Sequence, residues 1–413
     1  MRVLVLTESF PTPEHPGRGI FIREQVKALS QTHAVTVLFP RPTLPGIRSS
    51  SLEPRAEALD SNHPDRPAAA GPAPRLSILR PGYFYVPRNR SIRVHQLARL
   101  LRRTLGEVLE PFDIVHAHWL APAGAAAVLG TAGLNIPVVV TAHAGDIYRD
   151  LRHAKHVRVA QQVAKQASRI IAVADYFREP LARVGAAPEK LSVIHNGVDL
   201  NVFVPGDRDK ARAELQLPAG VPLYLYIGNL EEAKGAADLV ETFFAHAPAA
   251  AMLVVTGTGP LWGRFARRAA ASGGRMILRG WQPHEAVARY LTAADCFVLP
   301  SYAEGNPVTV LESLCCGRPV IGSSIPAIAP LIEEGKSGLL ISPGDIPALG
   351  LAMRILPKMQ WDAVAIARQA AVRYGWSAVA ARISEVYAEA VAEDRVRRTA
   401  SCGPEFIPAA PPR

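Results

Sequence analysis

Several features that would assign the chain to a particular class of protein are missing from its sequence. It has only four cysteines, all in the C-terminal half, and their spacing is that of neither a disulfide framework nor a metal site. No apolar run approaches the ~18 residues that a membrane-spanning helix needs. The first apolar run is followed by Glu8 and a proline, not by the small-residue cleavage site of a secretory signal. We therefore expect a cytoplasmic protein that does not cross the membrane.

The length of the chain indicates two domains. Its 413 residues exceed the ~250 to 300 at which single hydrophobic cores stop growing. We expect a first domain over residues 1–203, a second over 204–376, a C-terminal helix over 377–395 that packs back on the first domain, and a disordered tail over 396–413. Residues 41–90 are predicted to be a partly irregular insertion, because much of this stretch is dense in Pro, Ser and Ala.

Short β-branched or apolar runs alternate with amphipathic stretches along both halves of the chain. The runs are 2–7, 34–39, 76–80, 113–118, 138–143, 169–174 and 191–196 in the first half, and 223–229, 252–257, 276–280, 296–301, 319–323 and 338–342 in the second. Nearly continuous hydrophobic strands that alternate with helices are typical of parallel sheets covered on both faces. The predicted fold is therefore α/β, with two doubly wound, Rossmann-like domains in tandem.

A helix is predicted to follow the strand at 296–301. Asn306 is a good N-cap residue, and Pro307 suits the first helical position. In an open parallel sheet, ligands bind at the carboxyl ends of strands, and the free N–H groups of a helix N-terminus hold phosphate. We therefore expect the phosphates of a ligand to lie beside Asn306, Pro307, Val308 and Thr309.

Two carboxylates flank the start of this predicted helix. Glu304 precedes it in the loop, and Glu312 lies one turn beyond Val308 on the same face, so both can point into one crevice. A carboxylate accepts hydrogen bonds from adjacent hydroxyl groups, and two carboxylates spaced in this way can hold two different sugars. Each would more often be a solvated acid if it stood alone, and their shared context favours a function.

The carboxylate pair belongs to a longer series of sequence blocks. The stretch EGNPVTVLE, an E-x7-E motif, and the SLCCGRPVI that follows it resemble the retaining glycosyltransferases of family 4. The blocks GRGIFIREQVKAL, DIVHAHW, VVVTAHAGDI, VIHNGVDLNVFVP, YLYIGNLEEAKG, VVTGTGPL and GLLISPGD agree with that family in the same order. The resemblance covers nearly the whole chain and implies the GT-B fold, in which two Rossmann-like domains face each other across a cleft.

The resemblance implies a role for individual residues. Glu312 would bind the donor ribose, and Glu304 would bind the hydroxyl groups of the transferred sugar. Lys234 would hold the diphosphate, which the backbone of Gly19 would approach from the first domain. His143 would lie beside the transferred sugar. Glu304, His143 and Lys234 are thus the expected catalytic residues, and no metal or other cofactor is implied.

The activity that the resemblance implies is transfer of a hexose-type sugar from a UDP- or GDP-sugar to a glycan or lipid-linked acceptor, with retention, in polysaccharide biosynthesis. This chain departs from the family pattern at Asn229, an expected donor-binding residue that stands where the family usually has arginine. It also lacks a glycine pair that the family usually has near Pro326 and Ala327. Two alternatives stay open: a nucleotide-sugar-binding partner subunit that has lost catalysis, and a nucleotide-sugar epimerase.

Two further patterns could indicate a metal. His116 and His118 alternate on one predicted strand and share a face, but no third ligand follows at zinc spacing, so core and crevice positions are favoured. Asp207 and Asp209 form a D-x-D between Arg208 and Lys210, where a solvated turn is the favoured interpretation.

The positive charge is concentrated in the first half of the chain. Residues 1–200 contain 25 Lys and Arg against 16 Asp and Glu, whereas the rest contain 21 against 20. Two basic clusters stand out, from Arg88 to Arg103 and from Arg149 to Arg158. We expect them to meet an anionic membrane surface or an anionic acceptor, with a merely solvated face as the alternative. Nucleic acid is not expected, because no aromatic platform is interleaved with the basic residues.

Overall fold

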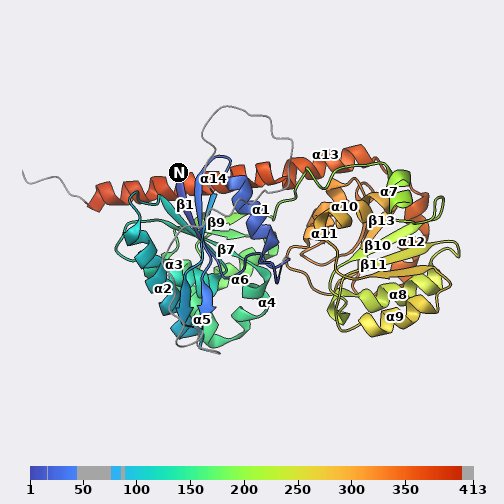
Figure 1. The fold of residues 1–413 in the computed structure, drawn as a ribbon, viewed down its shortest axis with the longest axis horizontal. Coiled ribbons are helices and arrows are strands. Elements are labelled where there is room, and N and C mark those ends of the chain that lie inside the picture. Colours follow the sequence, from blue (N-terminus) through green and yellow to red (C-terminus); the bar gives the residue numbers. More distant parts are fainter. Residues whose placement is uncertain (16, 44–75, 85–88, 402–413) are drawn as a thin grey trace, which may run out of the picture. The chain divides into compact units, whose positions relative to one another are not determined.

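The computed structural model describes residues 1–15, 17–43, 76–84 and 89–401. The chain forms two compact units, which can be followed in Figure 1 by the colours that run along the sequence. Unit 1 comprises Met1–Val173, Phe177–Ile194 and the chain from Ala380 on; unit 2 comprises Ala174–Tyr176 and His195–Val379. The division after Ile194 follows the last strand of the first sheet, so the expected boundary at residue 203 lies inside unit 2.

Unit 1 is built on a parallel sheet of seven strands. In hydrogen-bonded order they are β4 (Leu76–Leu79), β2 (Ala34–Leu38), β1 (Arg2–Leu6), β6 (Ile114–His118), β7 (Val138–Ala142), β8 (Arg169–Ala172) and β9 (Leu191–Val193). Two further strands, β3 (Arg41–Thr43) and β5 (Gly82–Phe84), form a separate parallel pair. The direction of winding reverses between β1 and β6, which is where doubly wound sheets bind ligands.

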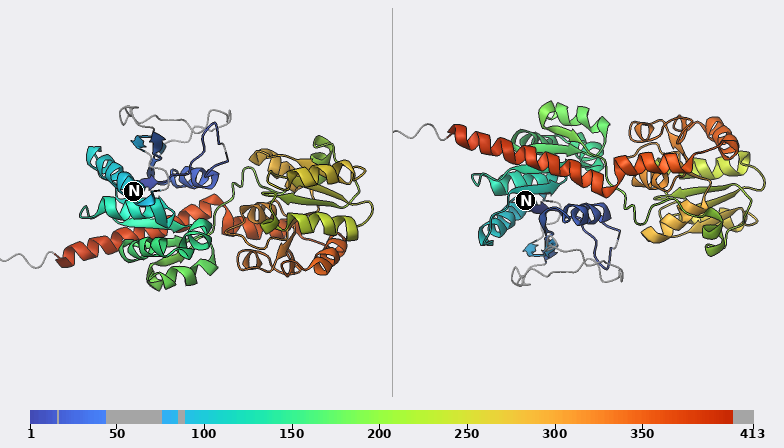
Figure 2. Two further views of the ribbon diagram at one scale, coloured as in Figure 1. Left: turned by 90° about the horizontal axis from the view of Figure 1, so that it is seen from below. Right: turned by 90° about the horizontal axis from the view of Figure 1, so that it is seen from above.

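Helices cover both faces of this sheet, as Figure 2 shows from two sides. They are α1 (Ile20–Leu29), α2 (Arg90–Glu107), α3 (Ala125–Thr131), α4 (Ala144–Tyr148), α5 (Ala154–Gln166), α6 (Arg178–Arg183) and the part of α14 (Trp376–Ser401) from Ala380 on. The expected helix at 377–395 thus continues to Ser401, so residues 396–401 are helical; residues 402–413 lie outside the described part.

Helix α14 is attached to unit 1 by buried polar contacts. The Tyr387 hydroxyl lies 2.6 Å from Nδ1 of His116, and the Arg169 guanidinium on β8 pairs with Glu389 and Glu393. Because a buried guanidinium without a counter-ion is costly, these pairs fix where the helix lies on unit 1.

Unit 2 has a parallel sheet of six strands. In hydrogen-bonded order they are β12 (Met276–Arg279), β11 (Met252–Thr256), β10 (Leu223–Ile227), β13 (Cys296–Leu299), β14 (Val320–Ser323) and β15 (Gly338–Ile341). Its helices are α7 (Arg208–Glu214), α8 (Ala236–His246), α9 (Trp262–Ala270), α10 (His284–Ala293), α11 (Val308–Cys315), α12 (Ile346–Ile355) and α13 (Ala363–Tyr374). In Figure 1, α8 and α9 lie on one face and α10 and α11 on the other. The winding reverses between β10 and β13.

All thirteen predicted strands are present, and most of their side chains are buried. The reason is that each strand of a parallel sheet is covered by helices on both faces and must be apolar throughout. Most of the stretch 41–90, expected to be partly irregular, lies outside the described residues; of its described part, β4 joins the main sheet. Among the described helices, none is both long and apolar enough to cross a membrane.

Candidate functional site

In unit 2, the direction of winding reverses between β10 and β13, and the loops that follow these two strands bring Lys234 and Glu304 together. Lys234 follows β10, Glu304 follows β13, and Nζ of Lys234 lies 2.8 Å from a carboxylate oxygen of Glu304. The Ser301 hydroxyl donates to the other carboxylate oxygen at 2.9 Å, and the Tyr176 hydroxyl donates to the Glu304 carbonyl at 2.7 Å. Two residues that lie 70 positions apart in the chain therefore form one charged pair, as the expected shared site requires.

A glycine makes this approach of the two loops possible. Gly235 adopts φ of +62°, and a Cβ atom there would lie 2.1 Å from the carbonyl oxygen of Pro300. Only glycine combines a left-handed backbone with so close a neighbour. Gly235 thereby sets the position of the adjacent Lys234.

The helix that follows Glu304 begins one residue later than predicted. Pro307 is in an extended conformation and occupies the N-cap position, so α11 starts at Val308. Asn306 is therefore not the N-cap; its side-chain amide lies 2.9 Å from Nδ1 of His195. The backbone N–H groups of Val308 and Thr309 precede the first helical hydrogen bond and stay available to a ligand.

Glu312 lies in the second turn of α11 and is buried, with 5% of its surface exposed. Within the described part of the chain, its carboxylate makes no hydrogen bond or ion pair. Burial alone raises its pKa from 4.5 to about 8. A buried carboxylate is normally paired, so this one indicates a place for a ligand with hydrogen-bond donors.

Asn229, at the end of β10, is exposed. Its loop is held by the turn that contains Gly257 and Gly259, because the Leu230 N–H donates to the Thr258 carbonyl at 2.9 Å. A Cβ atom on Gly257 would lie 1.9 Å from the carbonyl oxygen of Gly228. The glycines of GTGPL thus let two strand-end loops touch.

In unit 1, the expected site residues are Gly19 and His143. Gly19 is the N-cap of α1 with φ of +67°, and a Cβ atom there would lie 2.4 Å from the Ser9 carbonyl oxygen. The loop after β1 therefore stays close to the start of α1, whose first N–H groups are free of helical acceptors.

His143, at the end of β7, is enclosed by aromatic rings. Its ring centroid lies 4.7 Å from that of Trp119 and 5.2 Å from that of Phe21, and its Nε2 lies 3.1 Å from Nδ1 of His118. Burial, followed by the nearby His116, lowers the pKa of His143 to about 3. The imidazole is therefore neutral at physiological pH and can act as a hydrogen-bond partner but not as a cation.

His116 and His118 share a face of β6 as expected, with ring centroids 4.7 Å apart. Both ring nitrogens of His116 are used inside unit 1, by Tyr387 and Thr141. Nε2 of His118 is buried and has no hydrogen-bond partner among the described residues. His118, which sequence reasoning left between core and crevice, therefore joins His143 in the candidate site.

Asp146 was missed at the level of sequence. Its buried carboxylate accepts from the backbone N–H groups of His143, at 2.9 Å, and Leu120, at 3.0 Å. It therefore joins the loops after β7 and β6, the two that carry His143 and Trp119. The only available signal was an Asp three residues after a strand-end His, which is a helix-capping pattern.

Asp207, considered for metal binding together with Asp209, has other partners. The Asp207 carboxylate caps α7 by accepting from the N–H groups of Asp209 and Lys210. Across the described ranges, no group of three or more His, Cys, Asp or Glu side chains is arranged to hold a metal ion.

Replacing Glu312 with glutamine is expected to stabilise the fold in a pH-dependent way. The folded-state pKa of about 8 exceeds the ordinary 4.5, so the folded state binds the extra proton between these values and stability falls as pH rises through that window. Glu312→Gln should therefore raise the Tm at pH 8.5, through a gain in unfolding free energy of at most about 5 kcal/mol, and should raise it less at pH 5. Thermal unfolding at both pH values measures this.

The matched control is Glu214→Gln, which changes an exposed acid of the same unit. It should shift the Tm little at either pH. An equal effect of Glu312→Gln at pH 5 and pH 8.5 would contradict the buried, unpaired carboxylate.

Two family models cover most of the chain. The model described as Glycosyltransferase Family 4 matches residues 17–202, and the one described as Glycosyl transferases group 1 matches residues 221–357. The first match falls on unit 1, apart from residues 174–176 and 195–202, and the second falls on unit 2.

Relatives of known name agree with these matches. A D-inositol 3-phosphate glycosyltransferase of Thermobispora bispora is 31% identical over 318 residues, which is 71% of this chain and 73% of that protein. TuaC of Bacillus subtilis, whose name places it in teichuronic acid biosynthesis, is 29% identical over 368 residues, which is 86% of this chain and 88% of TuaC.

Solved structures share the fold. Sucrose-phosphate synthase from Thermosynechococcus elongatus superimposes with a TM-score of 0.73 at 21% identity, over 95% of this chain and 100% of that one. HepE from Anabaena, solved in complex with UDP-glucose, gives a TM-score of 0.66 at 16% identity, over 94% and 99%. The motifs, the two Rossmann-like units and these matches together place the chain in family 4 of the glycosyltransferases, enzymes of GT-B fold.

Proposed function

We propose that the chain transfers a hexose-type sugar from a UDP- or GDP-sugar to a hydroxyl group of a glycan or lipid-linked acceptor, with retention and without a metal ion. The observation that carries the proposal is the buried, unpaired carboxylate of Glu312, one turn into the helix that follows the Lys234–Glu304 pair. It is a strong acceptor that lacks a donor, next to groups suited to phosphate and sugar.

A ribose supplies the hydrogen-bond donors that Glu312 lacks. Its two adjacent hydroxyl groups can both donate to one carboxylate, and a charged acceptor makes such bonds worth about 1.5 to 3 kcal/mol each. Binding would also compensate the desolvation that raises the pKa of Glu312. We therefore assign Glu312 to the donor ribose.

The diphosphate needs positive charge. Lys234 is about one-quarter exposed in its pair with Glu304, so the ammonium group can donate to a phosphate oxygen with a proton that Glu304 does not use. The free N–H groups at Val308 and Thr309 and the partial positive charge of the α11 N-terminus add to it. Together they would stabilise a leaving diphosphate as metal ions do in other transferases.

Retention follows in this proposal from attack on the same face as the leaving group. The departing phosphate oxygen would accept the proton of the acceptor hydroxyl, so no protein group needs to act as the base. Glu304 would position the transferred sugar through its hydroxyl groups. His143, neutral because burial lowers its pKa to about 3, would hydrogen-bond that sugar without adding charge.

The names of the relatives support this assignment. HepE binds UDP-glucose in its solved complex, which is the donor class proposed here. TuaC is named for teichuronic acid biosynthesis, and the T. bispora enzyme for D-inositol 3-phosphate.

One observation favours a second candidate, a partner subunit that binds the nucleotide sugar without catalysis. The exposed Asn229 places no cation at the end of β10, where the family usually has arginine. Turnover of donor separates the two functions.

We propose further that unit 1 associates with an anionic leaflet. Arg99, Arg102 and Arg103 are exposed on α2, opposite the buried Leu97 and Leu101. Each basic side chain near such a surface contributes about 1 kcal/mol. We expect the protein to co-sediment with anionic but not with neutral vesicles. Salt, or replacement of these three arginines with serine, should weaken that binding. Equal binding to both vesicle types would refute the proposal.

Changes at Glu312 and Glu304 should affect different steps. Glu312→Ala should weaken binding of free nucleoside diphosphate by about tenfold or more, because the ribose loses a charged acceptor. Glu304→Ala should lower turnover more than it lowers that affinity, and wild-type activity should persist in EDTA. Calorimetry with UDP and GDP, and transfer assays with their sugars, measure both effects.

Glu214→Ala, on the exposed face of α7, is the matched control and should behave as wild type. Wild-type turnover in both site variants would overturn the site assignment. A complete loss of transfer in EDTA that Mg²⁺ restores would overturn the metal-free reaction.

A further inference from the structure

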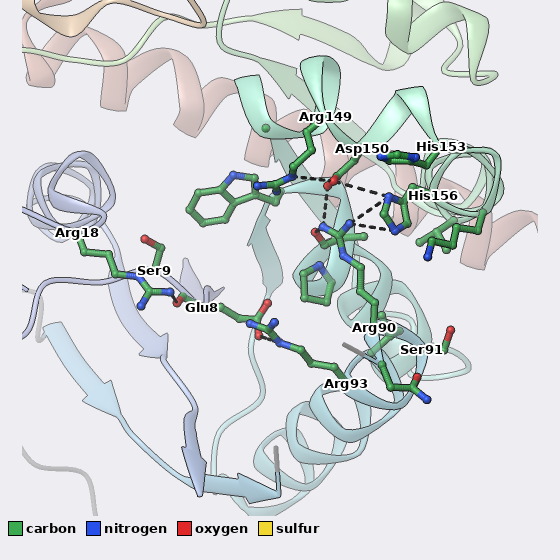
Figure 3. A pocket seen from close by; sticks show the side chains of 18 residues that line it. Glu8, Ser9, Arg18, Arg90, Ser91, Arg93, Arg149, Asp150, His153 and His156 are labelled. Carbon is green, nitrogen blue, oxygen red and sulfur yellow. Dashed lines mark hydrogen bonds and ion pairs between the residues drawn. The ribbon is translucent and has the colours of Figure 1, made fainter. Parts of the chain in front are cut away.

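The two basic clusters of the sequence supply side chains to one cavity in unit 1. The cavity has a volume of about 1040 Å³. Arg90 and Arg93 reach it from α2, Arg149 and Lys155 from the segment between α4 and α5 and from α5 itself, and Arg18 from the loop after β1. Figure 3 shows these arginines arranged around Asp150 and Glu8. The clusters were expected to meet an anionic membrane surface or an anionic acceptor, and the fold turns part of each into this cavity.

The cavity carries more positive charge than its own acids neutralise. Five arginine and lysine side chains line it, and only the carboxylates of Glu8 and Asp150 oppose their charge. Glu8 pairs with Arg93, and the Asp150 carboxylate is shared by Arg90, at 2.6 Å, and Arg149, at 3.1 Å. Three positive charges therefore remain without an acid in the cavity.

The arginines around Asp150 are held in place before any ligand binds. Arg90 donates to the Ala121 carbonyl at 2.7 Å as well as to Asp150. Burial would raise the pKa of Asp150, but hydrogen bonds from Arg90 and Arg149 outweigh it and lower that pKa. Asp150 therefore stays ionised and orients two guanidinium groups.

Two cations at the rim of the cavity have donor groups left for a ligand. The Arg149 side chain is 69% exposed and uses one N–H group on Asp150, which leaves other donors for a ligand. Lys155 is exposed and has no ion-pair partner among the described residues. An oxyanion with several acceptor oxygens could bind both at once.

The remaining wall of the cavity is apolar. Trp119, Pro122, Val94 and Val159 line it. An aromatic face and small apolar groups suit the C–H face of a sugar or polyol ring, which is also the kind of molecule that presents a hydroxyl group to a glycosyltransferase.

We propose that this cavity binds the phosphate group of a phosphorylated acceptor, with Arg149 and Lys155 contacting the phosphate and Arg90 acting as a positioning residue through Asp150. The inference rests on the proposed function, because it names the acceptor class of that transfer. A phosphate fits better than a carboxylate because it has more acceptor oxygens and up to two negative charges, which matches a surplus of three cations. The phosphate could belong to a soluble phosphomonoester or to the diphosphate of a lipid-linked sugar.

The first experiment measures binding of inorganic phosphate by calorimetry, at constant ionic strength, to wild type and to two variants of equal charge. Arg149→Ser with Lys155→Ser removes the two rim cations of the cavity. Arg152→Ser with Arg158→Ser, the control, removes two exposed cations of the same segment that do not line it. The cavity variant should lose about tenfold or more in affinity, and the control about twofold or less. No phosphate binding to wild type, or equal losses in both variants, would overturn the proposal.

The second experiment compares acceptors at saturating donor. The wild type should prefer a phosphorylated acceptor to its unphosphorylated counterpart in kcat/KM, and the cavity variant should lose that preference while the control keeps it. Sugar phosphates in solution and polyprenyl diphosphate sugars in neutral vesicles identify the source of the phosphate. Nucleoside diphosphate affinity, a property of unit 2, should be the same in all three proteins. Transfer without any preference for phosphorylated acceptors would refute this inference and leave the proposed function intact.

Discussion

Glu312 is a buried residue of unit 2 whose carboxylate has no hydrogen-bond or ion-pair partner among the described residues. Burying an ionisable group without a partner lowers stability, and the raised pKa of Glu312 expresses that cost. A residue of this kind is explained by a ligand that supplies the missing donors. The rest of the candidate site is arranged around it: the helix that carries Glu312 begins beside the Lys234–Glu304 pair, and Gly235 fixes the loop of that pair.

The doubly wound sheets explain why residues far apart in the chain meet. In unit 2 the reversal between β10 and β13 brings their exit loops side by side, which joins Lys234 to Glu304. In unit 1 the corresponding reversal lies between β1 and β6, whose exit loops carry Glu8 and Trp119, and the phosphate-binding cavity opens there. Both proposed ligand sites therefore lie where open parallel sheets bind ligands.

Much of the fold and part of the candidate site could be predicted from the sequence, because the signals were local. Strands buried on both faces are continuous apolar runs, so all thirteen were found, and the E-x7-E block located Glu304 and Glu312. What could not be predicted depended on contacts distant in sequence. The positions of Arg90 and Arg93 depend on Asp150 and Glu8, and helical periodicity does not reveal such partners. The N-cap prediction failed at Asn306 because Pro307, which is extended, took the cap position.

The central claim is that Glu312 is kept unpaired in order to receive the two ribose hydroxyl groups of the donor. Calorimetry can test it with the nucleoside diphosphate that binds most tightly and its 2′,3′-dideoxy analogue, each titrated into wild type and Glu312→Ala. The account predicts that wild type loses about tenfold or more in affinity for the analogue, and that Glu312→Ala binds both ligands with similar, weak affinity. Equal affinity of wild type for the two ligands, or undiminished discrimination in Glu312→Ala, would contradict it.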